Sequence, residues 1–243
     1  MKLTTKISKI TTVVFDLDDT LYDEVDYCRS GFLAVADFLD ELLEDDDTNS
    51  EIIFNTLWKH FCKGNHSRTF NATLEELQIP YNDELISEMI RTYREHKPNI
   101  TLPQDSLGIL KQLSKKYKLA LLTDGFLPAQ KLKVQALKIE KFFKCIIYTE
   151  ELGRDFWKPS PVGFEKILKV LKTKPENAVY IADNEKKDFI APNQLGFLTI
   201  QLVRDAHIHT STGLKPEFTA QHIIKEMSKI PALLEQSGIG VTH

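Results

Sequence analysis

Short apolar strands that alternate with helical segments are the feature that most limits how this chain can fold. Five runs rich in β-branched, aliphatic and aromatic residues are predicted to be buried strands, at residues 11–15, 119–122, 145–148, 178–182 and 197–203. Segments with helical spacing of apolar side chains lie between them, at residues 103–117, 127–137 and 162–171. This alternation implies right-handed crossovers and predicts an α/β fold, with a parallel sheet covered by helices on both faces.

Residues from about 22 to 99 interrupt the alternation. Phe32, Val35, Leu39 and Leu43 follow helical spacing, and the segments 52–61, 74–77 and 85–93 continue as helices. We expect an all-helical insertion between the first strand and its crossover helix, large enough to act as a lid. The predicted domains are a core of residues 1–21 and 100–243 and an insertion of residues 22–99. A last amphipathic helix is expected at residues 220–236.

Composition and charge argue against several functional classes. The chain of 243 residues has a net charge of −4, so it has no basic excess with which to bind nucleic acid. Cys28, Cys62 and Cys145 are odd in number and far apart, which favours a reducing compartment over a disulfide framework. The N-terminus lacks the apolar segment of a signal peptide, and no apolar run is long enough to cross a bilayer. We therefore expect a cytoplasmic protein without membrane or nucleic-acid partners.

The first predicted strand ends in the acidic stretch Asp16-Leu17-Asp18-Asp19-Thr20. Carboxylates at positions i and i+2, Asp16 and Asp18, can face one small volume as the chain leaves the strand. Burying two like charges is costly unless they share a proton or a cation neutralises them, and Mg²⁺ binds such hard oxygen ligands. We expect Asp16 to attack phosphorus and Asp18 to protonate the leaving alkoxide before it activates water. The alternative is an acidic turn that caps the strand.

The second strand is followed by Thr123-Asp124-Gly125. The Thr123 hydroxyl and the backbone N–H groups of this glycine-containing turn are suited to hold phosphoryl oxygens. We predict that Asp124 and Gly125, together with Thr20, bind the substrate. An ordinary turn is the alternative.

Lys158 stands in the segment Trp157-Lys158-Pro159-Ser160-Pro161, before a predicted helix. The two prolines restrict the backbone and fix the direction in which Lys158 projects. An ammonium held in this way can neutralise negative charge on Asp16 and on a transferred phosphoryl group. A solvated loop lysine is the alternative.

The fourth strand leads into Asp183 and, one turn into the next helix, Asp188. Asp183 is placed where a third carboxylate can reach the same cation, and Asp188 can support it or bind the metal directly. A helix N-cap at Asp183 or Asn184 is the alternative. Because ligands of parallel sheets bind beyond the carboxyl ends of the strands, the four polar clusters together form a set of groups suited to phosphoryl transfer.

This set of clusters resembles the four-motif signature of the haloacid dehalogenase superfamily, and the matching stretches are residues 16–20, Thr123, Lys158-Pro159 and residues 183–188. The resemblance covers nearly the whole chain with the motifs in the right order. It implies a Rossmann-like core with a helical cap inserted after the first strand, at the C1 position of subfamily I. One departure is Ala182, which precedes Asp183 where many relatives carry Gly or an acid.

The resemblance also implies a role for each matching position. Asp16 would be the nucleophile and Asp18 the general acid and base. Thr123 would contact the phosphoryl group, and Lys158 would stabilise negative charge. Mg²⁺ would be held by Asp16, the backbone carbonyl of Asp18, and Asp183.

Asp18 favours phosphate esters over haloacids. Family members that cleave carbon–halogen bonds lack an acid two residues after the nucleophile, because a halide leaves without a proton whereas an alkoxide needs one. The chain is therefore predicted to be a magnesium-dependent phosphatase that acts on a small phosphorylated metabolite, such as a sugar phosphate or nucleotide, through an aspartyl-phosphate. A phosphomutase, a phosphonate hydrolase, a haloacid dehalogenase or a non-catalytic binding module on the same fold are the alternatives. Both a monomer and a homodimer are compatible with the sequence.

The predicted cap offers weaker candidates. Arg68 lies in its most loop-like basic segment and is predicted to contact an anionic substrate, although a solvated arginine fits the sequence equally well. His60, Cys62 and His66 do not have the spacing of a structural zinc site. His207 and His209 are expected on a surface loop rather than at a metal.

Overall fold

The computed structural model describes residues 9–43, 48–64, 66–204 and 218–236 of the chain. The described chain divides into two compact units. One contains the described parts of residues 1–24, 101–125 and 137–243, and the other contains those of residues 25–100 and 126–136. Residues 126–136 were expected in the core, but in the structure they group with the helices of the insertion. The acidic residues 44–47, whose sequence is more typical of a solvated helix end than of a metal site, lie outside the described residues, as do His207 and His209.

The first unit is built on a six-stranded sheet in the order β3-β2-β1-β4-β5-β6. All neighbouring strands are parallel. The strands are β1 (Thr12–Phe15), β2 (Lys118–Thr123), β3 (Cys145–Tyr148), β4 (Ala178–Ala182), β5 (Leu198–Leu202) and β6 (His222–Ile224). The central strand β1 pairs Phe15 with Leu121 on one side and with Ile181 on the other. The predicted Rossmann-like α/β fold is confirmed.

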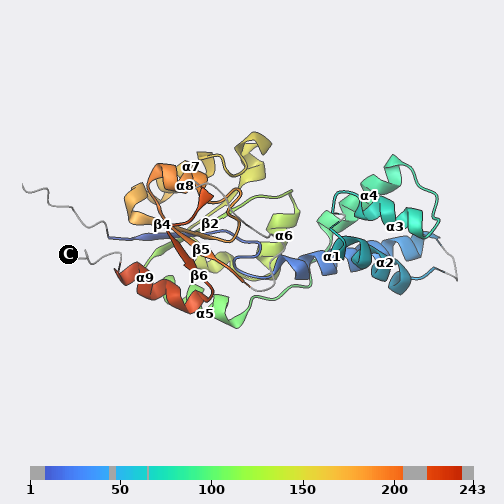
Figure 1. Ribbon diagram of the computed structural model, residues 1–243, viewed down its shortest axis with the longest axis horizontal. Coiled ribbons are helices and arrows are strands. Elements are labelled where there is room, and N and C mark those ends of the chain that lie inside the picture. The colour runs from blue at the N-terminus through green and yellow to red at the C-terminus, as the bar shows by residue number, and fades with distance from the viewer. Residues whose placement is uncertain (1–8, 44–47, 65, 205–217, 237–243) are drawn as a thin grey trace, which may run out of the picture. The chain divides into compact units, whose positions relative to one another are not determined.

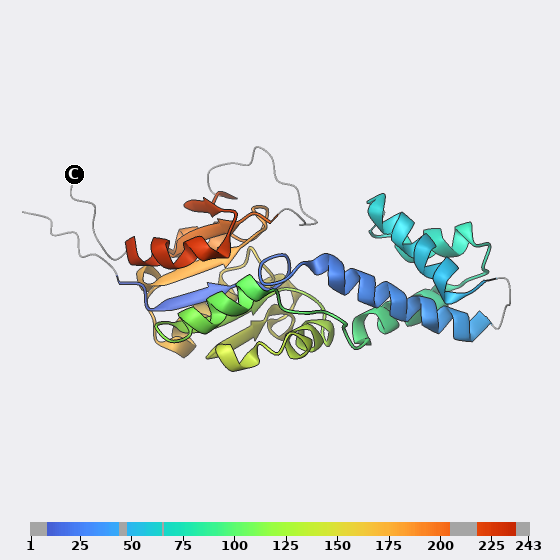
Figure 2. The same cartoon turned by 90° about the horizontal axis from the view of Figure 1, so that it is seen from below.

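Helices cover both faces of this sheet. Figures 1 and 2 show α7 (Val162–Leu171) and α8 (Ile190–Leu195) on one face, and α5 (Gln104–Leu113) and α9 (Ile230–Gln236) on the other. On the α7 face, Val14, Leu122 and Tyr180 form a buried cluster with Phe164 of α7. Short 3₁₀ helices lie at η1 (Glu140–Phe142), η2 (Thr149–Leu152), η3 (Arg154–Phe156), η4 (Pro175–Asn177) and η6 (Met227–Lys229).

The prediction of one continuous helix at residues 220–236 is wrong. The segment begins as strand β6, continues through η6 and becomes helical only at α9. The apolar run His222-Ile223-Ile224 instead extends the sheet, where Ile200 of β5 pairs with His222. As an edge strand, β6 provides hydrogen-bond partners for the backbone of β5. The free energy of this pairing exceeds the weak preference of so short a segment for a helix.

Close packing of α7 on β2 gives a test of the core. A Cβ added to Gly163 of α7 would lie 2.7 Å from Cδ1 of the buried Leu122. We expect Gly163→Ala to lower the free energy of unfolding, measured by urea denaturation, by about 1–2 kcal/mol. The matched control is Gly108→Ala on the exposed side of α5, where an added Cβ meets no atom within 4 Å. The control should be more stable by up to about 1 kcal/mol, and equal stability of the two variants would contradict this packing.

The second unit is all-helical in its described residues. It contains α1 (Glu24–Leu43) from Val25 onward, α2 (Ser50–Cys62), α3 (Thr69–Glu76), α4 (Asp83–Glu95) and α6 (Ala129–Ala136). Asparagine side chains cap two of these helices, because Asn49 accepts from the backbone of Ile52 and Asn82 from that of Leu85. Aromatic contacts hold the helices together around Phe32, whose neighbours are Trp58, Phe61, Phe70 and Tyr93.

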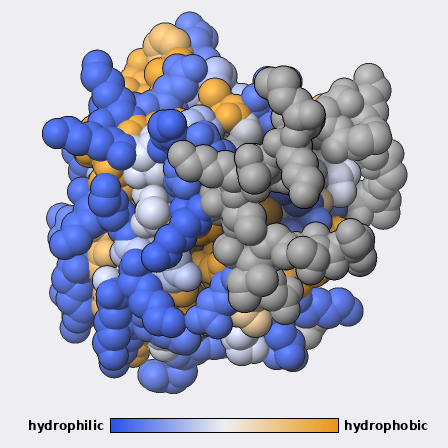
Figure 3. Space-filling model, turned by 90° about the vertical axis from the view of Figure 1, so that its left-hand side faces the viewer, coloured by the Kyte–Doolittle hydropathy of each residue, from blue (hydrophilic) through white to orange (hydrophobic). Residues whose placement is uncertain are grey.

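One face of the molecule is drawn in space-filling form in Figure 3. The face drawn in Figure 3 is mostly hydrophilic, with hydrophobic atoms scattered among the polar ones. Among the described residues, no helix combines the length and the apolar character that a bilayer crossing needs.

Candidate active site

Four of the predicted residues meet at the carboxyl edge of the sheet. Asp16 follows β1, Thr123 ends β2, and Asp183 follows β4. Because β1 lies between β2 and β4, these three positions are neighbours. The backbone N–H of Asp16 donates to the carbonyl of Ile181 at 3.0 Å, which extends the β1–β4 ladder as far as the site. Lys158 joins them from the segment after η3, since its Nζ lies 2.6 Å from Oδ1 of Asp16.

The chain turns sharply after Asp16. Asp19 adopts a left-handed conformation with φ of 54°, which Asp tolerates better than most residues. Its carboxylate accepts a hydrogen bond from the backbone of Glu24 at 2.8 Å, where α1 begins. Asp18 is partly exposed, and its Oδ1 accepts a 2.6 Å hydrogen bond from the buried Tyr22 hydroxyl. Tyr22 thereby orients Asp18 while leaving it accessible to a bound molecule.

Lys158 forms ion pairs with two buried carboxylates. Its side chain is 1% exposed, and Nζ contacts Oδ1 of Asp16 at 2.6 Å and Oδ1 of Asp188 at 2.8 Å. It also donates to the Tyr180 hydroxyl at 3.1 Å. Burial alone would lower the pKa of Lys158, but the charges of Asp16 and Asp188 outweigh it and hold this pKa well above the ordinary value. The ammonium is therefore charged at all physiological pH values.

Protein groups surround the carboxylate of Asp188. Oδ1 accepts from Tyr180 at 3.0 Å in addition to its contact with Lys158, and Oδ2 accepts from the backbone of Asn184 at 3.0 Å. Burial would raise its pKa, but Lys158 and Lys187 hold it below the ordinary value. These contacts favour the supporting role that the sequence suggested for Asp188 over direct metal ligation.

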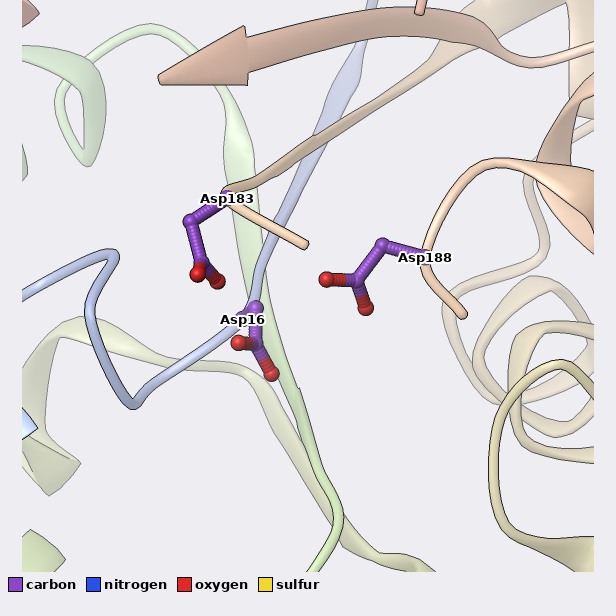
Figure 4. A group of neighbouring side chains, drawn as sticks. All are labelled: Asp16, Asp183 and Asp188. Carbon is purple, nitrogen blue, oxygen red and sulfur yellow. The ribbon is translucent and has the colours of Figure 1, made fainter. Parts of the chain in front are cut away.

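Asp16, Asp183 and Asp188 are neighbours (Figure 4), and each offers a carboxylate oxygen that lies within 4.8 Å of those of the other two. Burial raises the pKa of Asp16 to about 7, although the charge of Lys158 opposes this and that of Lys187 adds to the opposition. Burial, reinforced by the charges of Asp16 and Asp188, raises the pKa of Asp183 to about 9. Repelling buried carboxylates of this kind are the donors that a hard divalent cation binds and neutralises, so the residues fit Mg²⁺.

The remaining residues predicted to bind the substrate differ in how available their side chains are to a ligand. Thr20 lies in the site, where its hydroxyl donates to Oδ1 of Asp183 at 3.4 Å. Thr123 is buried at the strand end, and Gly125 follows it with φ of 140°. The Asp124 carboxylate is engaged by the protein, since Oδ1 accepts from Thr149 at 2.8 Å and from the backbone of Lys158 at 3.2 Å. If Asp124 contacts the substrate, its backbone rather than its carboxylate makes the contact. This contact stays a prediction.

Arg68 belongs to the helical unit, where it precedes α3. Its guanidinium pairs with Glu75 at 2.9 Å, and both side chains are exposed. The predicted contact of Arg68 with the substrate stays a prediction.

Several residues that shape the site were missed from the sequence. Tyr180 contacts both Lys158 and Asp188, and Thr149 holds Asp124. Gln201 donates to the backbone carbonyl of Asp183 at 2.9 Å. Tyr180 and Gln201 lie within strands and look like core positions, so only the sheet register shows their roles. Lys187 could have been predicted from the sequence, because it immediately precedes Asp188 in the recognised motif of residues 183–188.

The chain is similar to known proteins over most of its length. A family model described as haloacid dehalogenase-like hydrolase matches residues 13–202. A glyceraldehyde 3-phosphate phosphatase from Methanocaldococcus jannaschii is 30% identical over 201 residues, which are 80% of this chain and 86% of that protein. Human N-acylneuraminate-9-phosphatase is 24% identical over 94% of this chain and 95% of that protein.

A solved structure shares the fold. It is a putative hydrolase of the same superfamily from Bacillus subtilis, bound to magnesium, with a TM-score of 0.63 and 20% identity. The superposition covers 93% of this chain and 99% of that one.

Proposed function

We propose a specific reaction for this chain, which belongs to the haloacid dehalogenase-like hydrolases and is a phosphoric monoester hydrolase of that family. The proposed reaction is the magnesium-dependent hydrolysis of a small phosphomonoester through an aspartyl-phosphate on Asp16. The observation that carries the proposal is the contact between Asp16 and Lys158 at the carboxyl edge of the sheet, next to Asp183.

The first step forms the covalent intermediate. A carboxylate oxygen of Asp16 attacks phosphorus, the phosphorus–oxygen bond to the alcohol breaks, and the departing alkoxide takes a proton from Asp18. Tyr22 holds Asp18 in place for this transfer. The ammonium of Lys158 opposes the effect of burial on the pKa of Asp16 and so favours the ionised, nucleophilic carboxylate.

The second step regenerates the enzyme. Asp18, now ionised, removes a proton from water as the water attacks phosphorus, and the bond to Asp16 breaks to release inorganic phosphate. A bound Mg²⁺ would supply positive charge for the carboxylates and the phosphoryl oxygens. Asp16, Asp183 and the backbone carbonyl of Asp18 would hold it.

The substrate is proposed to be a small phosphorylated metabolite, such as a sugar phosphate. The curated relatives named above act on glyceraldehyde 3-phosphate and on an N-acylneuraminate 9-phosphate. The absence of a basic excess agrees with such a substrate, and we propose that the protein works in the cytoplasm as a monomer or homodimer.

A phosphate-release assay tests the proposal. The protein should release inorganic phosphate from an aryl phosphate when Mg²⁺ is present, and a panel of sugar phosphates and nucleotides should then identify better substrates. Chelation by EDTA should stop release, and added Mg²⁺ should restore it. Phosphate release that is unchanged in EDTA would contradict the metal dependence, and no release from any panel member would contradict the phosphatase itself.

Metal binding should also change how stability depends on pH. Unfolded aspartates titrate near pH 3.9, whereas the pKa of Asp16 is raised to about 7 and that of Asp183 to about 9 in the folded protein. The metal-free folded state keeps these protons longer than the unfolded chain, so its stability should fall as the pH rises through these values. Because Mg²⁺ binds the ionised carboxylates, it should raise the melting temperature more at about pH 9 than at about pH 6. Differential scanning fluorimetry measures this, with Asp183→Asn expected to weaken the Mg²⁺ effect; equal Mg²⁺ effects at both pH values would contradict it.

Asp18 should matter most for poor leaving groups. An alkyl alcohol needs protonation as it departs, whereas an activated aryl oxide barely does. We expect Asp18→Asn to lower kcat for an alkyl phosphate by roughly 10²- to 10⁴-fold, and to affect formation of the aspartyl-phosphate from an activated aryl phosphate much less. Single-turnover measurements with both substrates separate the two effects. Equal losses in that first step would remove Asp18 from the role of general acid.

A further inference from the structure

The donors of Lys158 are already committed within the protein. An ammonium carries three N–H donors and no acceptor. Nζ of Lys158 contacts three protein oxygens, those of Asp16 at 2.6 Å, Asp188 at 2.8 Å and Tyr180 at 3.1 Å. A phosphoryl group that enters the site meets its charge but finds its donors engaged. A dianionic phosphoryl group in this site therefore has room for a second protein donor, in addition to the proposed Mg²⁺.

The side chain of Lys187 extends from the loop after β4 toward the loop after β2. It stands in the loop after β4, and its Nζ lies 3.8 Å from Oδ2 of Asp124, which follows β2. Strand β1 lies between β4 and β2 in the sheet. The side chain of Lys187 starts in the loop after β4 and ends beside the loop after β2. It therefore passes the end of β1, where Asp16 is located.

The loop that carries Lys187 is held by local hydrogen bonds. The backbone N–H of Lys187 donates to the carbonyl of Asn184 at 3.2 Å, and that of Asp188 donates to the same carbonyl at 3.0 Å. The Asn184 side chain accepts from the backbone of Lys186 at 3.1 Å. The backbone at Lys187 is thus held in place by the protein itself.

The ammonium of Lys187 has donors to offer. The side chain is 35% exposed, in contrast to 1% for Lys158. Its contact with Asp124, at 3.8 Å, is an ion pair longer than a hydrogen bond. Within the part of the chain that the structure describes, no hydrogen bond of this ammonium is found. Asp124 meanwhile is fixed by Thr149 and by the backbone of Lys158, so it holds Lys187 near the site without using up its donors.

We propose that Lys187 binds a non-bridging oxygen of the substrate's phosphoryl group and is, beside Lys158, the second protein cation of the site. This inference rests on the proposed phosphatase function and assigns a division of labour to the two lysines. Lys158 neutralises Asp16 and Asp188 from within the protein, whereas Lys187 meets the substrate from the solvent side.

The test is the affinity for inorganic phosphate, the product, measured by calorimetry in the presence of Mg²⁺. Lys187→Met removes the charge and keeps most of the apolar stem. It should weaken phosphate binding by roughly tenfold or more, the scale of one charge-assisted hydrogen bond. Lys187→Arg should retain most of the affinity, because it keeps a cation at the same place. The matched control is Lys186→Met, since Lys186 is the adjacent lysine of the same loop and is exposed.

The outcomes separate this inference from the proposed function. Wild-type protein that neither binds phosphate nor hydrolyses any ester would contradict the phosphatase proposal. Wild-type hydrolysis together with unchanged phosphate affinity in Lys187→Met would overturn only the role of Lys187. Equal weakening in Lys186→Met and Lys187→Met would also overturn it, because it would show a general effect of loop charge.

A measurement on unmodified protein keeps the inference testable if Lys187→Met folds poorly. Lysine acetylation by a reagent in limiting amount, followed by peptide mass spectrometry, reports the accessibility of each ammonium. Inorganic phosphate with Mg²⁺ should slow the modification of Lys187 several-fold and leave that of Lys186 unchanged. Equal rates at Lys187 with and without phosphate would refute the contact.

Discussion

Replacing Asp16 by Asn is expected to abolish phosphate release while leaving the protein folded. The amide keeps the shape of the carboxylate but cannot form an acyl phosphate, so kcat should fall by roughly 10⁴-fold or more, the scale found when a nucleophile is removed from an enzyme. Phosphate release from an aryl phosphate measures the loss. Acid quenching followed by mass spectrometry should find the phosphoryl group on the Asp16 peptide of the wild type and not on that of Asp16→Asn.

Stability should respond in the opposite direction. Asp16 is buried and its pKa is raised to about 7, so above neutral pH the metal-free protein holds a charge at a place that disfavours it. Asn removes that charge and still offers an oxygen to Lys158. In EDTA at about pH 8, Asp16→Asn should therefore melt no lower than the wild type.

An exposed aspartate provides the matched control. Asp155 lies in η3 on the surface of the same unit, so Asp155→Asn should leave both activity and stability unchanged. Metal-dependent turnover that survives Asp16→Asn would sink the assignment of the nucleophile. A variant that loses activity only because it unfolds would be recognised by its lowered melting temperature.

The site was largely predictable because its residues follow strands. Asp16 and Asp183 each come directly after an apolar β-branched run, and a parallel sheet brings such positions to one edge. The contact between Lys158 and Asp16 was expected from the motif that contains Lys158 rather than from the apolar pattern.

Contacts that depend on register and on short segments were not predictable. Tyr180 occupies a strand position that is typical of the core, yet its hydroxyl contacts both Lys158 and Asp188. Residues 222–224 were expected in a helix and form β6, because three residues carry too little periodicity to oppose pairing with β5. In both cases contacts between segments far apart in the sequence determine the structure, and the local spacing of residues does not predict such contacts.

Lys158→Met should cost both activity and stability. The lysine is buried between Asp16 and Asp188, so its removal leaves two carboxylates without their cation and next to Asp183. Breaking a buried ion pair by deleting one partner destabilises by about 3–5 kcal/mol. The loss of positive charge beside the nucleophile should lower kcat by at least roughly 10²-fold. Urea denaturation in EDTA and phosphate release with Mg²⁺ measure the two effects, and Lys111→Met on the exposed face of α5 is the control.

The pH dependence identifies the cause of that destabilisation. Without Lys158, burial is no longer outweighed at Asp188, and the pKa of this carboxyl should rise as that of Asp183 already does. The folded variant then binds more protons than the unfolded chain, so its stability should fall with rising pH more steeply than that of the wild type. The loss should be larger at about pH 8 than at about pH 5, and Mg²⁺ should restore part of the stability because it supplies the missing charge. A loss that is the same at both pH values and insensitive to Mg²⁺ would mean that Lys158 stabilises the fold through packing of its apolar stem, and not through the carboxylates it joins.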